Sequence, residues 1–427
     1  MQQKYDKFGN LIDPTTGYAR GQILKSSFEE ERKRVRGNFL IRRRIEEFGL
    51  EGVFNFTGLD RRFPLNQDDI QSDSLLDGYW GPAYFEEKLS DIATKHLGGN
   101  NNEHSSTFFA RTTAGIVVAE YALVKKEEDK TIISVVPKGH SHPSIARGAE
   151  LVGAKFIEIC SSKELEDLLK EKKLFPLVVI TGTTMLWDIF ELTELKRLIK
   201  ISKERGLTVF LDDAAAGVRT VYGKQPPALE LGVDLAIISV YKAGFLGPRC
   251  GFMVGRKNLI DHIQAYSFEF GVEAQSQTKL AILRSLEKYD PHRLLENKKT
   301  LEEIYTEGKK TFGDKLSKSS SVDFLNISME RVLEIVVEKS GITSTSVVPA
   351  EAASALAMIL LENYGIMTVP TTGAPGCTLD IRLRPYNDEL KKFGSARQVI
   401  EALDECFNKL AKIINQPDKM RKILLGK

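Results

Sequence analysis

The 427-residue sequence is poor in the residues that build metal and disulfide sites. Its four cysteines, Cys160, Cys250, Cys377 and Cys406, are scattered without any CxxC pair. The six histidines do not join them at zinc-ligand spacing. The sequence therefore predicts buried thiols in a reducing compartment, and it predicts no metal site.

Long apolar runs and a strong excess of charge are also missing. No run approaches the ~20 apolar residues of a membrane-spanning helix, and the first ten residues, MQQKYDKFGN, are polar. Lys plus Arg number 60 and Asp plus Glu 58, for a net charge of +2. This balance gives no general reason to expect nucleic acid or a membrane as partner. We expect a cytoplasmic protein.

The common nucleotide-binding motifs are absent as well. No G-x-G-x-x-G follows a predicted strand. The stretch GVRTVYGK (217–224) departs from a P-loop because five residues separate its glycines and Gln225 stands where Ser or Thr is needed. NAD and ATP sites are therefore weakly supported.

The chain does contain short apolar strands that alternate with amphipathic helices. Strands are predicted at 106–110, 131–136, 176–182, 208–212 and 234–240. This alternation predicts an α/β fold with a mostly parallel, seven-stranded type of sheet sandwiched by helices. We expect three parts: an N-terminal basic and helical segment (1–60), a large domain (61–285) and a smaller α+β domain (286–427). In the last part, VLEIVVE (332–338) resembles a strand.

The N-terminal segment places Val35, Phe39, Ile45 and Phe48 at roughly helical spacing among charges. This pattern favours a surface helix with its basic side chains in solvent. An RNA-binding arm is the alternative, and residues 32–44 are the part that could bind tRNA. The interleaved glutamates disfavour tRNA because they would repel phosphate.

Acidic and basic residues stand at the ends of two predicted strands. Asp212 and Asp213 end one strand, and Lys242 follows the next, within a glycine-rich stretch. In such sheets, ligands bind at the carboxyl ends of the strands. The glycines leave room beside the lysine and permit unusual backbone angles. A carboxylate and a lysine are thus expected to face one ligand.

Two further strand ends carry groups for the same ligand. The stretch RTTAG (111–115) begins a helix, whose N-terminus favours a phosphate. His140 and His142 follow another strand. A lysine, a carboxylate, a phosphate site and a flat ring together suit pyridoxal 5′-phosphate (PLP).

Several stretches resemble a known family. FLDDAAAGVR, QPPALELGVDLAIISVYKAGFLGPRCGFMVGRK, EFGVEAQ and GAPG are similar to fold type I PLP enzymes, the aspartate aminotransferase superfamily. They look most like the selenocysteine synthase (L-seryl-tRNA selenium transferase) branch, especially its short archaeal homologues. The resemblance covers about residues 75–285 and is thinner to 390. It implies a homodimer or higher homo-oligomer, with residues 269–277 reaching the partner's site.

The resemblance implies roles for the residues around the lysine. Lys242 would form the Schiff base with PLP. Asp212 would pair with the pyridine nitrogen, with Asp213 as the alternative. Ala214 would pack under the ring, and Ser239, three residues before the lysine, would bind the phosphate.

The same resemblance implies a phosphate loop and a stacking ring. Arg111, Thr112 and Thr113 match the loop, and Arg111 has an ion-pair role as its alternative. His142 would stack on the cofactor ring, with His140 as its rival.

Other residues extend this expected site. Thr183 and Thr184 would line it near the cofactor. Arg382 would hold the substrate carboxylate, because a guanidinium binds carboxylates in a bidentate manner. Arg384, two residues on in the same strand, is the alternative. Arg249 would approach the phosphate or the substrate.

The resemblance favours β-elimination or β-replacement on a small amino acid, by a PLP-dependent transferase or lyase. Lys242, Asp212 and His142 are the expected catalytic residues. The alternatives are transamination, decarboxylation or an aldolase-type cleavage, or PLP binding without turnover. Ala215 supports the last alternative, because His, Tyr or Ser is common there in the family.

Overall fold

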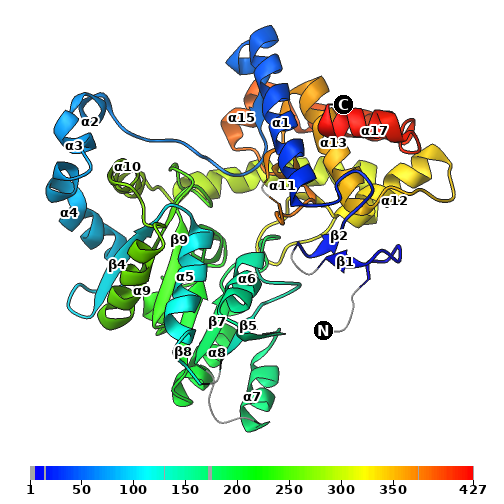
Figure 1. Ribbon diagram of the computed structural model, residues 1–427. Helices are drawn as coiled ribbons and strands as arrows, with labels where there is room; N and C mark the ends of the chain where they lie inside the picture. The colour runs from blue at the N-terminus through cyan, green and yellow to red at the C-terminus, as the bar shows by residue number, and fades with distance from the viewer. Residues whose placement is uncertain (1–4, 14–15, 129, 172–175, 374, 427) are drawn as a thin grey trace. The chain divides into compact units, whose positions relative to one another are not determined.

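The computed structural model describes residues 5–13, 16–128, 130–171, 176–373 and 375–426. The contacts divide the chain into two compact units, which Figure 1 shows. Unit 1 comprises Met1–Gly58 and Glu296–Lys427, and unit 2 comprises Leu59–Leu295. The N-terminal residues, which the sequence suggested as a segment of their own, thus pack with the C-terminal part of the chain.

Unit 2 is built around one mixed sheet. In its described part, seven strands follow the order β4-β10-β9-β8-β7-β5-β6. All neighbours are parallel except β10, which runs antiparallel to β4 and β9. The α/β fold expected from the sequence is confirmed. The strands are β4 His104–Phe109, β5 Thr131–Val135, β6 Lys155–Ile159, β7 Leu177–Thr181, β8 Thr208–Asp212, β9 Leu235–Ser239 and β10 Gly251–Arg256.

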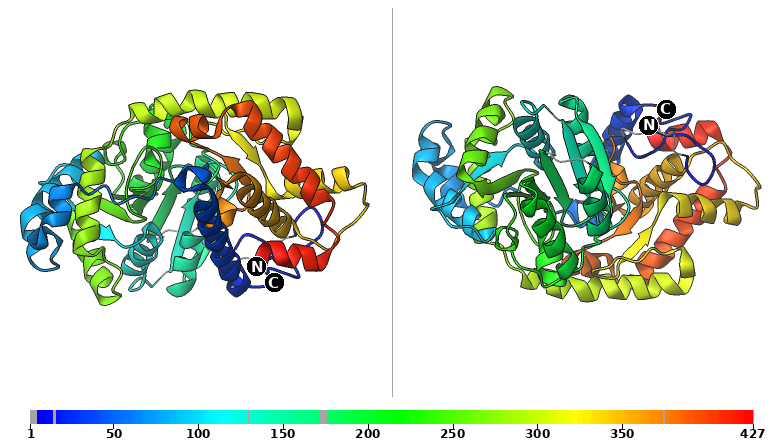
Figure 2. Two further views of the ribbon diagram at one scale, coloured as in Figure 1. Left: turned by 90° about the horizontal axis from the view of Figure 1, so that it is seen from above. Right: turned by 90° about the horizontal axis from the view of Figure 1, so that it is seen from below.

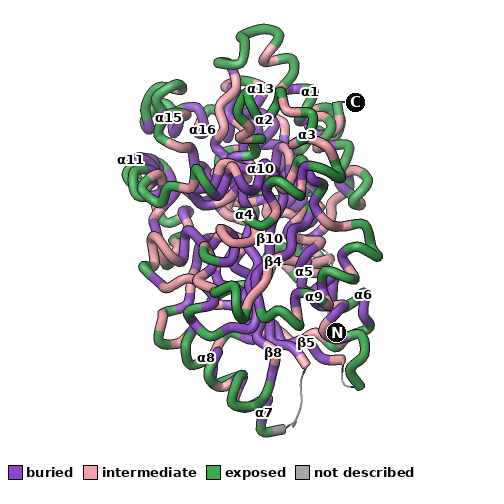
Figure 3. Tube along the Cα trace, turned by 90° about the vertical axis from the view of Figure 1, so that its left-hand side faces the viewer, coloured by how far each residue is buried: buried purple, intermediate pink, exposed green. Residues whose placement is uncertain are grey.

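Helices cover both faces of this sheet, as Figure 2 shows. Alternate residues of each strand point to opposite faces, so Val209 and Phe210 enter different apolar cores. In Figure 3, β5 and most of β8 and β10 run through purple, buried positions, whereas the first half of β4 is half-buried. One face packs on α5 Thr112–Val124, α6 Pro143–Leu151 and α9 Lys257–Glu269, and the other on α4 Trp80–His96, α7 Ser162–Glu171, α8 Leu192–Glu204 and α10 Ser276–Glu287.

Short elements connect these layers. A π-helix, an uncommon wide turn that recurs at functional sites, follows β8 at Val218–Tyr222. The others in unit 2 are α2 Gln67–Gln71, α3 Asp73–Leu76 and a 3₁₀ turn at Leu229–Leu231. No described helix of the chain is both long and apolar enough to cross a membrane.

Unit 1 consists of helices with small strand pairs. The pairs are β1 Ile12–Asp13 with β2 Tyr18–Ala19, β11 Leu325–Ile327 with β13 Ile381–Leu383, and β3 Phe54–Asn55 with β12 Ile366–Met367. Its helices are α1 Ser27–Phe48, most of α11 His292–Phe312, α12 Met329–Ser340, α13 Pro349–Tyr364, α14 Val369–Thr372, α15 Asn387–Phe393, α16 Ala396–Ala411 and α17 Pro417–Leu425. Short 3₁₀ turns lie at Leu50–Gly52 and Gly313–Lys315.

The strand expected at 332–338 is a helix, α12. The Ser328 hydroxyl accepts a hydrogen bond from the backbone N–H of Arg331 and caps its start. Gly341, in the left-handed conformation (φ 69°), ends it. Val332 and Val336 are buried one helical turn apart. The β-branched composition suggested a strand, but spacing and caps select the helix.

Helix α1 forms as expected, but its buried side is not the expected one. Val35, Phe39 and Phe48 are 55%, 52% and 51% exposed, whereas Lys33 and Leu40 are each only 1% exposed. The apolar spacing therefore identified the helix but not the side that packs in unit 1.

The cysteines are only partly as expected. Cys250 and Cys406 are buried, whereas Cys160, just beyond the end of β6, is exposed and Cys377 is half-buried.

Candidate functional site

Four sequence-predicted residues lie at the carboxyl edge of the unit 2 sheet. Asp212 is the last residue of β8 and Ser239 the last of β9. Arg111 follows β4, and His142 follows β5 as the residue before α6. Because β4, β5, β8 and β9 run in the same direction, their ends meet at one edge of the sheet, where α/β proteins bind ligands.

Lys242 lies in a turn beyond β9 rather than at its end. The strand stops at Ser239, and Lys242 then forms an isolated bridge with Leu59. The backbone N–H of Asp60 donates a hydrogen bond to the carbonyl oxygen of Tyr241 (3.0 Å). Residues 59–62 therefore hold the turn from outside the sheet.

Close backbone contacts explain two glycines around this turn. Ala243 has a positive φ of 47°. A Cβ on Gly217 would lie 2.3 Å from the carbonyl oxygen of Ala243, so no larger residue fits there. A Cβ on Gly251 would lie 2.6 Å from Oγ1 of Thr112. These glycines let the turn and the start of α5 approach their neighbours.

The two adjacent aspartates have different environments. Asp212 is 4% exposed and accepts a hydrogen bond from the backbone N–H of Ala214 (3.3 Å). Burial raises its pKa to about 6, and the charge of Lys242 opposes that rise. Asp213 instead binds the buried guanidinium of Arg219, through contacts of 2.7 and 3.2 Å. Of the two acids, Asp212 is therefore the one suited to a ligand beside Lys242.

The start of α5 suits an anion. The hydroxyls of Thr112 and Ser239 lie 2.7 Å apart. Arg111 occupies the N-cap position without a side-chain cap, so it leaves the first backbone N–H groups of the helix, including that of Thr113, to other partners. These N–H groups and the two hydroxyls form the elements of a phosphate site.

Positive charge gathers around Tyr241. Neither Arg111 nor Arg249 has an acidic partner among the described residues, and Nε of Arg249 is buried without a hydrogen-bond partner there. Burial lowers the pKa of Arg111, and the charge of Arg249 lowers it further. Burial opposes ionisation of the Tyr241 hydroxyl, but Lys242, Arg61, Arg249 and Arg111 together lower its pKa. Such a cluster indicates a bound anion.

His140 and His142 differ in their environments and hydrogen-bond partners. Nδ1 of His142 accepts a hydrogen bond from the backbone N–H of Ser144 (3.2 Å) and caps α6. Burial first, and then the charge of Lys242 and two arginines, lower its pKa to about 3, so its ring is neutral. His140 is exposed and lies 2.6 Å from Oε1 of Glu158. His142 is thus the histidine whose pKa is lowered by burial and by the charge of Lys242.

We expect His142 to make the cofactor-free protein sensitive to acid. Its pKa of about 3 in the folded state lies below its ordinary 6.5. Its contribution to stability is therefore complete above pH 6.5 and is lost as the pH falls toward 3. In H142N, which keeps a capping side chain, the unfolding free energy should fall between pH 7 and 5 by about 2 kcal/mol less than in the natural protein. Urea denaturation at pH 7 and pH 5 measures this. An equal decrease in the unfolding free energy of the two proteins would contradict it.

Thr183 and Thr184 have different hydrogen-bonding environments. The hydroxyl of Thr184 accepts hydrogen bonds from the backbone N–H groups of Leu186 (3.2 Å) and Asp188 (3.0 Å). It is occupied within its own turn. Oγ1 of Thr183 is buried without a hydrogen-bond partner in the described part of the chain. Thr183 is thus the better candidate for a ligand contact.

Arg382 and Arg384 belong to unit 1, and both are buried. Burial lowers the pKa of Arg382, and the nearby Asp380 opposes that change. The guanidinium of Arg384 lies 3.9 Å from the ring centroid of Phe324. Their assignment to the substrate carboxylate stays a prediction.

Three residues near the site, Tyr241, Arg61 and Arg219, carry no sequence motif that marks them. Tyr241 directly precedes Lys242, and that position was a usable signal. Arg61 reaches the ring of Tyr241 (5.6 Å to the centroid) because its segment pairs with the lysine turn. No local pattern shows such a pairing.

Known proteins resemble the chain in sequence and fold. The model of the family described as aminotransferase class I and II matches residues 66–390. A UPF0425 pyridoxal phosphate-dependent protein from Methanosphaera stadtmanae is 32% identical over 92% of this chain and 98% of its own. A SepCysS–SepCysE N-terminal domain complex has a chain with TM-score 0.55 and 14% identity, covering 84% of this chain and 95% of that one. For aspartate aminotransferase from Thermotoga maritima the TM-score is 0.56 and the identity 15%, covering 88% and 96%.

The residues at the sheet edge fit PLP. A buried carboxyl with a raised pKa stands beside the lysine. Two guanidinium groups without acidic partners among the described residues, and an uncapped helix start, suit a phosphate. Together they would offer one partner each to the ring nitrogen, the aldehyde and the phosphate of PLP.

Proposed function

We propose that this chain, which belongs to the aminotransferase class I and II family and is a PLP-dependent enzyme of fold type I, acts at Cβ of a small amino acid. The reaction would be β-elimination or β-replacement, as in a selenocysteine-synthase-like lyase or transferase. The observation that carries this proposal is the cationic cluster around Tyr241, next to the Lys242 amine.

The proposed cofactor contacts follow from the site geometry. Asp212 would keep the ring nitrogen protonated, because its carboxylate is buried and has no competing arginine like that of Asp213. Ser239, Thr112 and the first N–H groups of α5 would hold the phosphate. His142 would cover the ring as a neutral imidazole. Bound PLP supplies a conjugated ring that accepts electrons from the substrate Cα.

The protein's own groups would then move protons. The Lys242 amine would act as the base for the proton on Cα. Loss of a Cβ substituent needs a proton or a positive charge at the leaving group. Tyr241 is placed for that role, because the surrounding cations lower the pKa of its hydroxyl. Arg61, whose guanidinium lies over the Tyr241 ring, would stabilise a negatively charged leaving group.

Product analysis tests the reaction. The PLP-loaded protein is incubated separately with serine, cysteine and O-phosphoserine, and pyruvate and ammonia are measured. Release of both in equal amounts supports β-elimination. Formation of the 2-oxo acid of the intact substrate, of carbon dioxide or of an aldehyde would instead show transamination, decarboxylation or aldol cleavage. Absence of any product would favour PLP binding without turnover.

A homodimer belongs to the same proposal. Within residues 269–277, residues 272–274 lie along β4 at the edge of the sheet, where the backbone N–H of Ala274 donates to the carbonyl oxygen of Phe108 (2.9 Å). Oε2 of Glu273 is buried there without a hydrogen-bond partner in the described part of the chain. We expect the second subunit to pack at this edge of the sheet.

A further inference from the structure

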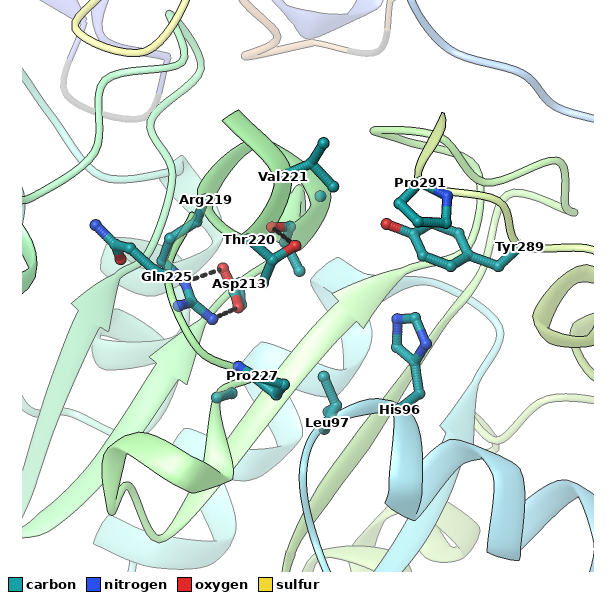
Figure 4. Close-up of a pocket in the computed structure, with 13 residues that line it drawn as sticks. His96, Leu97, Asp213, Arg219, Thr220, Val221, Gln225, Pro227, Tyr289 and Pro291 are labelled. Carbon is teal, nitrogen blue, oxygen red and sulfur yellow. Dashed lines mark hydrogen bonds and ion pairs between the residues drawn. The ribbon is translucent and has the colours of Figure 1, made fainter. Parts of the chain in front are cut away.

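A cavity lies beside the candidate active site but shares none of its proposed cofactor contacts. Its volume is ≈ 340 Å³, within the usual range of small-ligand pockets, which begins at about 300 Å³. Figure 4 shows His96 and Tyr289 on one side and Arg219 and Gln225 on the other. Its walls come from the end of α4, the π-helix after β8 and the segment before α11.

The charges in the cavity wall cancel. Arg219 binds both carboxylate oxygens of Asp213 and also donates to the carbonyl oxygen of Pro226 (2.6 Å). Burial lowers the pKa of His96 to about 4, so its ring is neutral near pH 7. No other residue of the lining is Asp, Glu, Lys or Arg. An ion entering the cavity would therefore lose its hydration without gaining a counter-charge.

Two polar groups in the lining have hydrogen-bonding capacity to spare. The His96 ring makes no hydrogen bond among the described residues, although it lies edge-on to Tyr289 (4.9 Å). Oε1 of Gln225 is buried without a partner there, while its Nε2 donates to the carbonyl oxygen of Phe190 (2.7 Å). Both can accept a hydrogen bond. A ligand with an N–H or O–H group would supply it to His96, whereas Oε1 of Gln225 has almost no accessible surface.

The rest of the lining is apolar or aromatic. Tyr289 presents a ring that stacks on Phe245 from behind (4.3 Å between centroids). The other apolar members of the lining are Leu97, Ala216, Val221, Pro227, Ala228 and Pro291. Aromatic surfaces of this kind favour flat rings. We propose that the cavity is a second small-molecule site, for an uncharged aromatic compound that carries an N–H donor, of the indole class.

The cavity adjoins the turn that carries Lys242. Gly217 lines the cavity and packs against the carbonyl oxygen of Ala243, the residue after the lysine. Asp213, also in the lining, follows Asp212 directly. A ligand here would restrain the lysine turn and the strand end from behind. Occupancy should therefore change the visible absorption of the PLP-loaded protein as well as saturate in a binding assay.

Indole is the probe for the test. Calorimetric titration of the PLP-loaded, full-length protein should show saturable binding of indole and none of benzoate, which is charged. V221W should weaken indole binding at least tenfold by filling the cavity. H96F, which keeps the ring shape but removes its nitrogens, should also weaken it. V35W, at an exposed position of α1, is the matched control and should bind like the natural protein.

Several outcomes would overturn the proposal. They are the absence of saturable indole binding, equal binding of benzoate, or unchanged indole affinity in both V221W and H96F. If V221W does not fold, H96F decides alone. The assay measures binding, so its result does not depend on which reaction the enzyme catalyses.

Discussion

Replacing Lys242 with alanine should abolish measurable turnover. The amine has two proposed roles, as the attachment point of PLP and as the base for Cα. Loss of a positioned base alone lowers rates by on the order of 10²–10⁴-fold. Borohydride reduction should fix PLP to a peptide containing Lys242 in the natural protein and to no peptide in K242A. Mass spectrometry of the digests measures this.

The control is K257A, which removes an exposed lysine at the start of α9. It should retain both turnover and the reduced adduct. An adduct found on another lysine in the natural protein, or full turnover by K242A, would show that the site is wrongly assigned. K242A itself should lose the adduct but still bind PLP, because the proposed phosphate contacts do not involve Lys242.

The sheet could be predicted from sequence because its strands are buried on both faces. Runs such as LVVIT in β7 read as continuous apolar stretches between helical patterns. The helix α12 could not be predicted as easily, because its β-branched residues suit a strand until Ser328 and Gly341 are recognised as caps. The buried side of α1 was missed because tertiary contacts bury Lys33, a residue that composition assigns to solvent.

The site was predictable where it depends on strand ends. Asp212, Ser239 and the start of α5 follow from apolar runs that stop at polar residues. Arg61 was not predictable, because it reaches Tyr241 through pairing between residues 59–62 and the lysine turn. The difference between Asp212 and Asp213 also needed the structure. It depends on Arg219, which the sequence shows only as part of an incomplete P-loop pattern.

The buried ion pair between Asp213 and Arg219 should contribute strongly to the free energy of unfolding of unit 2. In R219M, the carboxylate of Asp213 would remain buried without its guanidinium, and the free energy of unfolding should fall by about 3–5 kcal/mol. R197M is the matched control. It breaks the exposed pair between Arg197 and Glu166 (3.0 Å), which contributes about 0–1 kcal/mol. Urea denaturation of both variants measures the difference.

The double variant D213L/R219M separates a missing pair from a misfolded turn. Removing both charges takes away the unpaired carboxylate, so the double variant should be more stable than R219M alone. Stability equal to or below that of R219M would mean that Arg219 acts through its bond to the carbonyl oxygen of Pro226 instead. In that case the π-helix, rather than the charge of Asp213, would be the feature that keeps the strand end of Asp212 in place.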